Sequence, residues 1–156
     1  MRVLAIDPGF GRCGMAVVER SGHKEVLLFS DCIETSSADE FSERLAAVAD
    51  ACRRLIEEYA PNAVALEKLF FQKNQKTAMR VAEVRGALIE TSARHNIPVV
   101  EYGPGQVKSA VAGSGKADKK AVAHMVHLLL KPTKTIKYDD EYDAIAIGIT
   151  HLAHAR

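Results

Sequence analysis

The amino-acid sequence predicts an α/β fold on a five-stranded mixed sheet, with the first three strands antiparallel and the later ones parallel. Three apolar segments follow one another through links too short for a parallel crossover. These segments are 3–6, 14–18 and 25–33. A helical pattern follows the third strand and leads to a fourth, 63–67. A helical crossover of this kind makes strand 63–67 a parallel neighbour of the first strand, 3–6. Both end in a carboxylate, Asp7 and Glu67.

Two long helices are predicted beside these strands. Capping residue types at 36–40 precede an apolar stripe at helical spacing that runs to about Tyr59. A second helix is predicted from Thr77 to Asn96. Its apolar positions occupy more than one face, so we expect the sheet to cover one side and a partner chain the other.

The C-terminal third of the sequence predicts a fifth strand and three further helices. The strand at 97–101 contains Pro98, which predicts a position at the edge of the sheet. The helices are expected at 104–112, 118–130 and 140–155. A single domain covering residues 1–156 fits this length.

Composition excludes several classes of protein. No apolar run reaches the ~18 residues of a membrane span, and the N-terminal pattern is not that of a signal peptide, so we expect a cytoplasmic protein. The cysteines are widely spaced and form no C-x-x-C pair, so we expect buried, reduced thiols. They are Cys13, Cys32 and Cys52.

Charge is distributed unevenly along a chain of net charge +1. Seven lysines and one acid lie between residues 106 and 137. Such a basic segment is typical of a contact with a phosphate backbone, and equally of a solvated surface. Residues 68–76 add three lysines around Phe70 and Phe71, and this segment contains no acid. Rings beside lysines suit stacking on bases, although either ring could belong to the core, and Phe70 is the stronger candidate for contact.

An acidic site is the main functional prediction. Asp140 and Asp143 are three residues apart and share a helix face. Asp143 precedes the apolar part of its helix, so we expect it to face the sheet and meet Asp7 and Glu67. Four ionised carboxylates repel one another unless divalent cations neutralise them, and all-oxygen ligands favour Mg²⁺ or Mn²⁺. Two such ions can support phosphodiester hydrolysis.

Other ionisable residues receive less specific interpretations. Asp139 and Glu141 are expected to complement the helix dipole in the first turn. Glu101 also follows an apolar run and is a competing candidate for the acidic site. The four C-terminal histidines form two pairs at helical spacing, with no acid or cysteine that completes a zinc site, so we expect structural or surface roles. They are His124, His127, His151 and His154.

Taken together, the sequence resembles the RuvC-type Holliday-junction resolvases of the ribonuclease H-like superfamily, nearly from end to end. The segments that carry the resemblance are 6–9, 66–70, 73–74, 106–108, 124–126, 142–147 and 150–151. The resemblance implies a ribonuclease H-like fold with helices on both faces of the sheet, and a homodimer. It also implies symmetric cleavage of two opposed strands of a four-way DNA junction, which leaves 5′ phosphates and 3′ hydroxyls, in recombination and repair.

The resemblance also assigns roles to residues. The catalytic, metal-binding acids fall on Asp7, Glu67, Asp140 and Asp143. The catalytic lysines fall on Lys108 and Lys119, with Lys120 as the alternative to the second. Further DNA-binding candidates are Phe70, Phe71, Lys73, Lys76, Lys116 and Lys120. The implied cofactor is Mg²⁺, replaceable by Mn²⁺, with two ions in each active site, and the implied partners are junction DNA, a second copy of the chain and a branch-migration motor.

Three alternatives remain open at this point. A YqgF-like nuclease would share the fold and acids but act on RNA. An actin-like phosphotransferase domain would also start with a strand, an aspartate and a glycine, yet it needs a second lobe for which 156 residues leave no room. A catalytically silent junction-binding module would bind DNA without cutting it.

Overall fold

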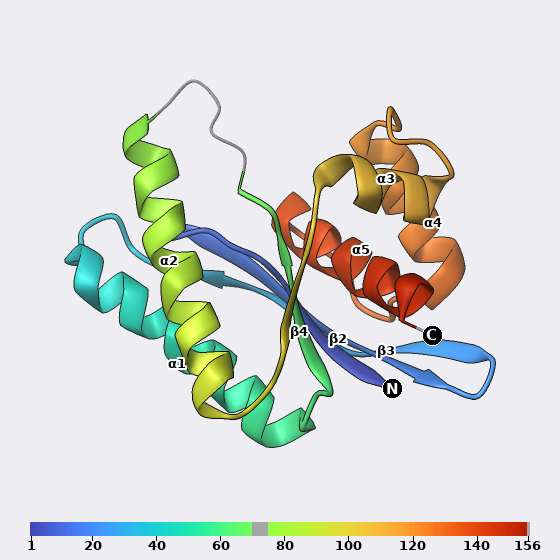
Figure 1. The fold of residues 1–156 in the computed structure, drawn as a ribbon. Helices are drawn as coiled ribbons and strands as arrows, with labels where there is room; N and C mark the ends of the chain where they lie inside the picture. Colours follow the sequence, from blue (N-terminus) through green and yellow to red (C-terminus); the bar gives the residue numbers. More distant parts are fainter. Residues whose placement is uncertain (70–74, 156) are drawn as a thin grey trace.

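The computed structural model describes residues 1–69 and 75–155 (Figure 1). Its strands are β1 (Arg2–Asp7), β2 (Arg12–Ser21), β3 (Lys24–Glu34), β4 (Ala63–Glu67) and β5 (Val99–Tyr102). Its helices are α1 (Phe41–Tyr59), α2 (Gln75–Arg94), α3 (Pro104–Ala112), α4 (Lys119–Leu130) and α5 (Asp139–His154).

The sheet has the predicted mixed topology. Its strand order is β3-β2-β1-β4-β5, with β1, β2 and β3 antiparallel and β4 and β5 added in parallel. The strand that contains the predicted edge signal, β5, does lie at an edge, and β3 forms the other edge. The α/β fold class predicted from the sequence is therefore confirmed.

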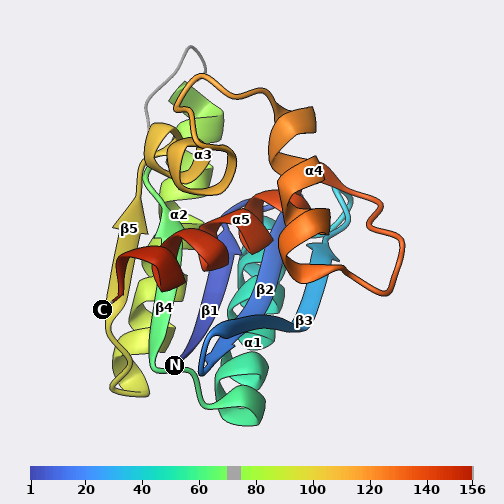
Figure 2. The same cartoon turned by 90° about the vertical axis from the view of Figure 1, so that its right-hand side faces the viewer.

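Two separate apolar cores cover the two faces of the sheet. Helices α1 and α2 pack on one face, while α5 crosses the other with α3 and α4 beside it (Figures 1 and 2). Strand alternation divides β1 between them: Leu4 and Ile6 face α1 and α2, whereas Val3 and Ala5 face α5. The predicted cover on both faces is confirmed.

Small residues let α5 lie close to the sheet. A Cβ added at Gly148 would lie 2.7 Å from a Val18 methyl group and 3.4 Å from the Cβ of Ala5. Alanines of the three central strands line the same face, as the α5-side core contains Ala5, Ala16 and Ala65. The helix is therefore seated at a distance that a bulkier surface would not allow.

Element boundaries differ from the predicted ones by a few residues. Strands β2 and β3 extend beyond the predicted apolar segments because they form a long hairpin that is paired along its length. Helix α2 begins and ends two residues earlier than predicted, and Asn96 beyond it adopts a left-handed conformation with φ of 57°. Helix α4 begins one residue after Asp118, which caps it: the Asp118 carboxylate accepts a hydrogen bond from the Ala121 amide at 2.8 Å.

All three cysteines are free thiols, as expected; Cys13 and Cys52 are buried and Cys32 is half-buried. Burial raises the pKa of Cys52 to about 12. Within residues 1–69 and 75–155, every helix falls short of the length or the hydropathy needed to cross a bilayer.

The closest approach between helix and sheet occurs at Gly14. A Cβ at Gly14 would lie 1.8 Å from the carbonyl oxygen of Asp140 and 3.1 Å from the amide nitrogen of Glu141. Only glycine therefore lets the first turn of α5 rest directly on β2.

We predict that Gly14→Ala lowers the free energy of unfolding by about 1–3 kcal/mol, because the new methyl group forces two backbone segments apart. Urea denaturation monitored by circular dichroism measures the change. Gly105→Ala is the matched control, since no atom lies within 4 Å of its added Cβ. Equal effects of the two substitutions would contradict the close approach described here.

Candidate active site

The first two acids stand at the ends of neighbouring parallel strands. β1 and β4 pair in register, with Ile6 opposite Leu66. Asp7 and Glu67 are the next residues along the two strands, so their carboxylates emerge from the same end of the sheet. Buried apolar runs before each acid fix these strand ends in the core.

The other two acids reach this end through the first turns of α5. Asp7 pairs with Gly14 in the β1–β2 ladder, and the backbone of Asp140 packs directly on Gly14. This contact brings the start of α5 next to the end of β1. Asp143 follows Asp140 by three residues and therefore emerges on a similar side of the helix.

Burial and mutual repulsion raise the pKa values of the carboxyl groups at this site. The pKa of Asp7 is raised from 3.8 to about 8, first by loss of solvent and then by the charges of Glu67, Asp143 and Asp140. The pKa values of Glu67 and Asp143 are raised as well, chiefly by burial. Lys119 opposes these shifts, because a nearby ammonium favours the ionised carboxylates.

Asp140 makes contact with a basic residue from β2. The Nε atom of Arg12 lies 3.1 Å from Oδ2 of Asp140, and the guanidinium also lies 4.9 Å from the ring centroid of Tyr138. The Oδ2 atom is buried but accepts no hydrogen bond of good geometry. The pair is therefore an ion contact that leaves an acceptor oxygen unsatisfied.

Two of the predicted lysines border the same site. Lys119 Nζ lies 3.3 Å from Asp143 and 3.5 Å from Asp139. Burial lowers the pKa of Lys119, but these carboxylates outweigh burial and the net shift is upward. Lys108 and Lys119 line a hollow of about 290 Å³ together with Glu67 and Asp143. Lys120 is exposed and does not line this hollow, so the geometry distinguishes Lys119 from its neighbour.

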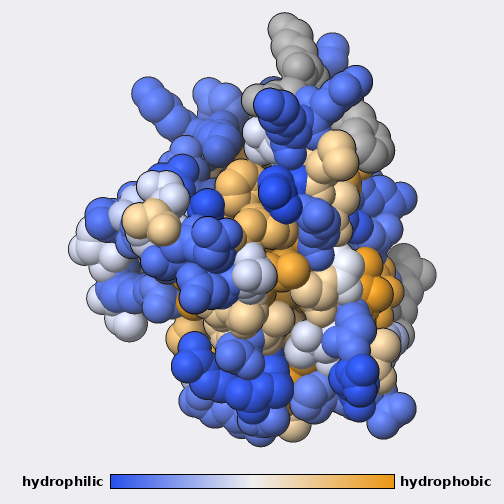
Figure 3. Space-filling model, turned by 90° about the vertical axis from the view of Figure 1, so that its left-hand side faces the viewer, coloured by the Kyte–Doolittle hydropathy of each residue, from blue (hydrophilic) through white to orange (hydrophobic). Residues whose placement is uncertain are grey.

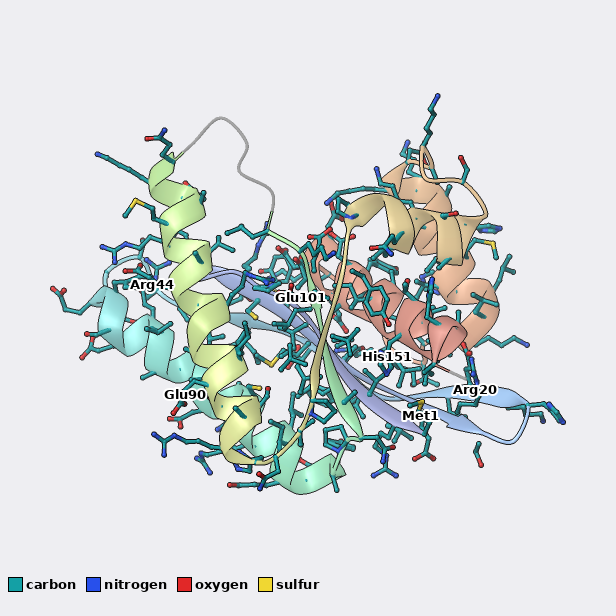
Figure 4. All side chains as sticks on the ribbon, viewed as in Figure 1. Met1, Arg20, Arg44, Glu90, Glu101 and His151 are labelled. Atoms are coloured by element: carbon teal, nitrogen blue, oxygen red, sulfur yellow. The ribbon has the colours of Figure 1, made fainter. Side chains whose placement is uncertain are left out.

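A second hollow of about 200 Å³ lies on the α2 side of Glu67 and is bordered by Asp7, Val81 and Arg85 among others. Arg85 is a buried residue of α2 that donates to the backbone carbonyl oxygen of Glu67 and forms an ion pair with Glu101. Glu101 lies on β5 on the side that faces α2 (Figure 4). It is therefore the counter-ion of Arg85, and the structure gives no support to its candidacy for the acidic site.

Sequence reasoning did not identify Arg85, although a signal was present. Arg85 falls on the buried stripe of α2 with Val84 and Leu88, at spacings that otherwise carry apolar residues. A charged residue in such a stripe needs a partner inside the protein. Glu101, the unexplained acid after an apolar run, was the available partner.

Glu141 lies in the first turn of α5, as expected, and it is also buried, since only 3% of its surface is exposed. Its carboxylate accepts a hydrogen bond from Ser30 and pairs with Lys134. Asp139 also lies in the first turn of α5, as expected, and it is exposed and near Lys119.

The predicted DNA-binding residues are only partly described. Phe70, Phe71 and Lys73 lie outside the described residues, so their predicted roles stay predictions. The remaining lysines are exposed: Lys76 in the first turn of α2, Lys116 before α4 and Lys120 in α4.

Three of the four C-terminal histidines, His127, His151 and His154, contact a tyrosine or the backbone. His127 Nε2 lies 2.7 Å from the Tyr142 hydroxyl, and His151 Nδ1 lies 3.1 Å from the Tyr102 hydroxyl. His151 is buried on α5, well away from the labelled residues of α1 and α2 (Figure 4). Burial, with a small contribution from His154, lowers the pKa of His151.

The four predicted acids offer the oxygen ligands that a hard divalent cation prefers. Among residues 1–69 and 75–155, no three acidic, histidine or cysteine side chains already stand at ligand spacing. Two of the four acids instead contact basic side chains, since Asp140 is paired with Arg12 and Asp143 with Lys119. The raised pKa of Asp7 indicates a carboxylate that lacks sufficient positive charge, and Oδ2 of Asp140 lacks a hydrogen-bond donor of good geometry. Carboxylate oxygens are the preferred ligands of Mg²⁺ and Mn²⁺.

Comparisons with known proteins agree with this fold and site. The sequence profile described as "Crossover junction endodeoxyribonuclease RuvC" matches residues 3–151. Proteins of that description from Petrotoga mobilis and Brachyspira hyodysenteriae are 43% and 42% identical, over 97% and 100% of this chain and 93% and 96% of theirs. The structure titled "T. thermophilus RuvC in complex with Holliday junction substrate" superposes with a TM-score of 0.93 at 35% identity, covering 100% of this chain and 95% of that one.

Fold and site together define a ribonuclease H-like, metal-dependent nuclease. The chain belongs to the RuvC family of crossover junction endodeoxyribonucleases.

The raised pKa of Asp7 predicts that the metal-free protein loses stability as pH rises. The folded state holds a proton on Asp7 up to about pH 8, whereas the unfolded chain releases it near pH 3.8. The stabilisation is therefore complete below the unfolded pKa and is lost as pH rises through the folded pKa.

Asp7→Asn removes this titration, so we expect it to stabilise the protein more at pH 8.5 than at pH 5. A difference of about 1 kcal/mol corresponds to roughly 2–4 °C in Tm for this chain length. Thermal melts in chelator at the two pH values measure it. Equal changes in Tm at both pH values would show that Asp7 ionises normally.

Proposed function

We propose that this chain is a single ribonuclease H-like nuclease domain that resolves four-way DNA junctions. It would hydrolyse phosphodiester bonds in two opposed strands symmetrically and leave 5′ phosphates and 3′ hydroxyls, in recombination and DNA repair. Membership of the family and the likeness to the junction-bound Thermus structure support this proposal.

One observation carries the assignment of the active site. Burial raises the pKa of Asp7 to about 8 together with the charges of the predicted acids Glu67, Asp143 and Asp140. A concentration of carboxylates at the ends of buried strands destabilises the protein unless it serves a ligand of opposite charge. Phosphodiester hydrolysis on a metal centre is the chemistry that uses such a ligand.

Asp7, Glu67, Asp140 and Asp143 are the residues that would hold the metal, as Mg²⁺ with Mn²⁺ as a substitute and two ions in each site. When bound, the metal lowers the pKa of water and stabilises charge on the oxygens of the scissile phosphate. The raised pKa of Asp7 implies that this residue releases its proton when the site is filled.

The lysines at the site would complement the DNA. Lys119 already balances Asp143 at 3.3 Å, and Lys108 borders the same hollow. If Asp143 held a metal, the ammonium group of Lys119 would be available to a phosphate oxygen or to the leaving group. Lys119, rather than Lys120, is therefore our candidate for the second catalytic lysine.

DNA binding would extend beyond the acids. We assign backbone contacts to Lys76, Lys116 and Lys120, whose exposed ammonium groups suit phosphates. Phe70 or Phe71 would stack on bases at the junction, with Lys73 beside them, as the resemblance implies.

A homodimer would match the two-fold symmetry of the substrate, since each active site cuts one strand. Apolar residues gather over the middle of the face that includes α1 and α2 (Figure 3). On α2, Met79 is 64% exposed and Ile89 is 38% exposed. Exposed apolar side chains on one helix are typical of a contact surface, so α2 is our candidate for the dimer interface. Cooperation with a branch-migration motor and a cytoplasmic location are further inferences from the DNA substrate and the family.

We predict that the protein makes paired nicks in a synthetic four-way junction with Mg²⁺, and none with chelator. Asp7→Asn should lower the cleavage rate by at least about 100-fold and leave junction binding intact, because one metal ligand is lost while the basic surface remains. Denaturing gels report cutting and mobility shifts report binding.

Linear duplex and an RNA–DNA hybrid are the control substrates. Cutting of RNA would favour the YqgF-like alternative, and binding without cutting would favour the silent module. Near-normal cleavage by Asp7→Asn would contradict the site.

We also predict that Met79→Glu weakens dimerisation at least tenfold, because it places a charge within the apolar face of α2. Light scattering coupled to size-exclusion chromatography measures the mass across a dilution series. Leu128→Glu on α4 is the matched control, as Leu128 is 56% exposed but lies on another helix. Loss of the dimer in the control alone would place the interface elsewhere.

A further inference from the structure

Glu141 is a buried acid with a hydrogen-bond donor and a counter-ion. Its Oε1 accepts from the Ser30 hydroxyl at 2.6 Å and lies 2.8 Å from Lys134 Nζ. Only 4% of its side chain is exposed, against 48% for Lys134. A carboxylate with this burial is stable only with a counter-ion and hydrogen bonds, and Glu141 has both.

Lys134 ties three elements together. Besides Glu141, its ammonium donates to the backbone carbonyl oxygen of Ser30 at 2.6 Å and lies 3.8 Å from Asp31. Lys134 itself belongs to the segment between α4 and α5, Ser30 to the edge strand β3, and Glu141 to the first turn of α5. The ion pair therefore fastens the start of α5 to the edge of the sheet.

Because Glu141 lies in the first turn of α5, its contact with Lys134 affects the orientation of the acids beside it. Glu141 lies between Asp140 and Asp143 in sequence, and successive helical residues are rotated by about 100°. Gly14 sets how close the first turn of α5 comes to the sheet. A directional ion pair that ties this turn to β3 adds a restraint on the rotation of the helix about its own axis. This rotation decides where Asp140 and Asp143 point.

We propose that Glu141 and Lys134 form a positioning pair that fixes the rotation of the first turn of α5 and thereby presents Asp140 and Asp143 to the metal. This inference rests on the proposed function of those two acids. Glu141 itself would touch neither metal nor DNA. Its effect passes through the helix, as groups that orient metal ligands do elsewhere.

The test separates positioning from stability with a double substitution. Lys134→Met alone strands a buried carboxylate and should destabilise the protein strongly. Glu141→Leu with Lys134→Met replaces the pair by apolar side chains with no change in net charge, so stability should stay near that of the wild type. The rotation of the helix would no longer be fixed by a charged, directional contact.

For the double variant we expect Mn²⁺ affinity of the protein alone to fall about tenfold, measured by electron paramagnetic resonance of free Mn²⁺. The Mg²⁺ concentration for half-maximal junction cleavage should rise by a similar factor, with junction binding in chelator unchanged. Glu141→Gln keeps an acceptor oxygen for Ser30 and Lys134, and should bind Mn²⁺ within about twofold of the wild type. Lys131→Met, an exposed lysine of the same loop, is the matched control.

The outcomes are distinct. A wild-type protein that fails to cut junctions would overturn the proposed function. If the wild type cuts and the double variant shows normal Mn²⁺ affinity and normal Mg²⁺ dependence, the positioning role is wrong and the pair is only structural. Should the double variant unfold, Glu141→Gln with Lys134→Met removes the ion pair and the tie from Lys134 to β3 without leaving a buried charge unpaired. Unchanged Mn²⁺ binding by that variant would equally overturn the proposal.

Discussion

Repulsion among carboxylates at one end of the sheet is the constraint around which the structure is arranged. Buried strands bring acids together where water cannot screen them, and each must find positive charge inside the protein or from a ligand. The described residues solve this with one basic partner for each of several acids. These pairs are Arg12–Asp140, Lys119–Asp143, Lys134–Glu141 and Arg85–Glu101.

Asp7 differs from these acids because it lacks a basic partner within the described part of the chain, and this lack suits a residue that binds a cation. Among the described residues it forms no ion pair within 4 Å, and its proton is held up to about pH 8. The protein can tolerate this because two apolar cores on opposite faces fix the strand that carries Asp7. Rigid strands supply the position of the acid, and the helix supplies its neighbours. The unfavourable ionisation of Asp7 is thus a property of the folded sheet, and a bound cation would remove it.

The sequence was sufficient for the sheet and for the meeting of the acids. Apolar runs that end in Asp7 and Glu67 mark strand ends, and a helical crossover between them makes the strands parallel, so convergence follows from topology. Glu141 could not be predicted in the same way. Its burial depends on Lys134 folding back onto β3, and no local pattern encodes that contact. Arg85 falls between these cases, because its place on a buried stripe is visible in the sequence but its partner is not.

The attachment of Lys134 to Ser30 also bears on how folded molecules meet one another. β3 is an edge strand, and the carbonyl oxygen of Ser30 accepts from Lys134 in the segment between α4 and α5. Unpaired acceptors along a sheet edge invite a strand from another molecule, and lysines at edges oppose such pairing. By engaging this acceptor with an ammonium group, the chain protects its longest exposed strand from edge-to-edge aggregation. Solubility and the geometry of α5 therefore depend on the same side chain.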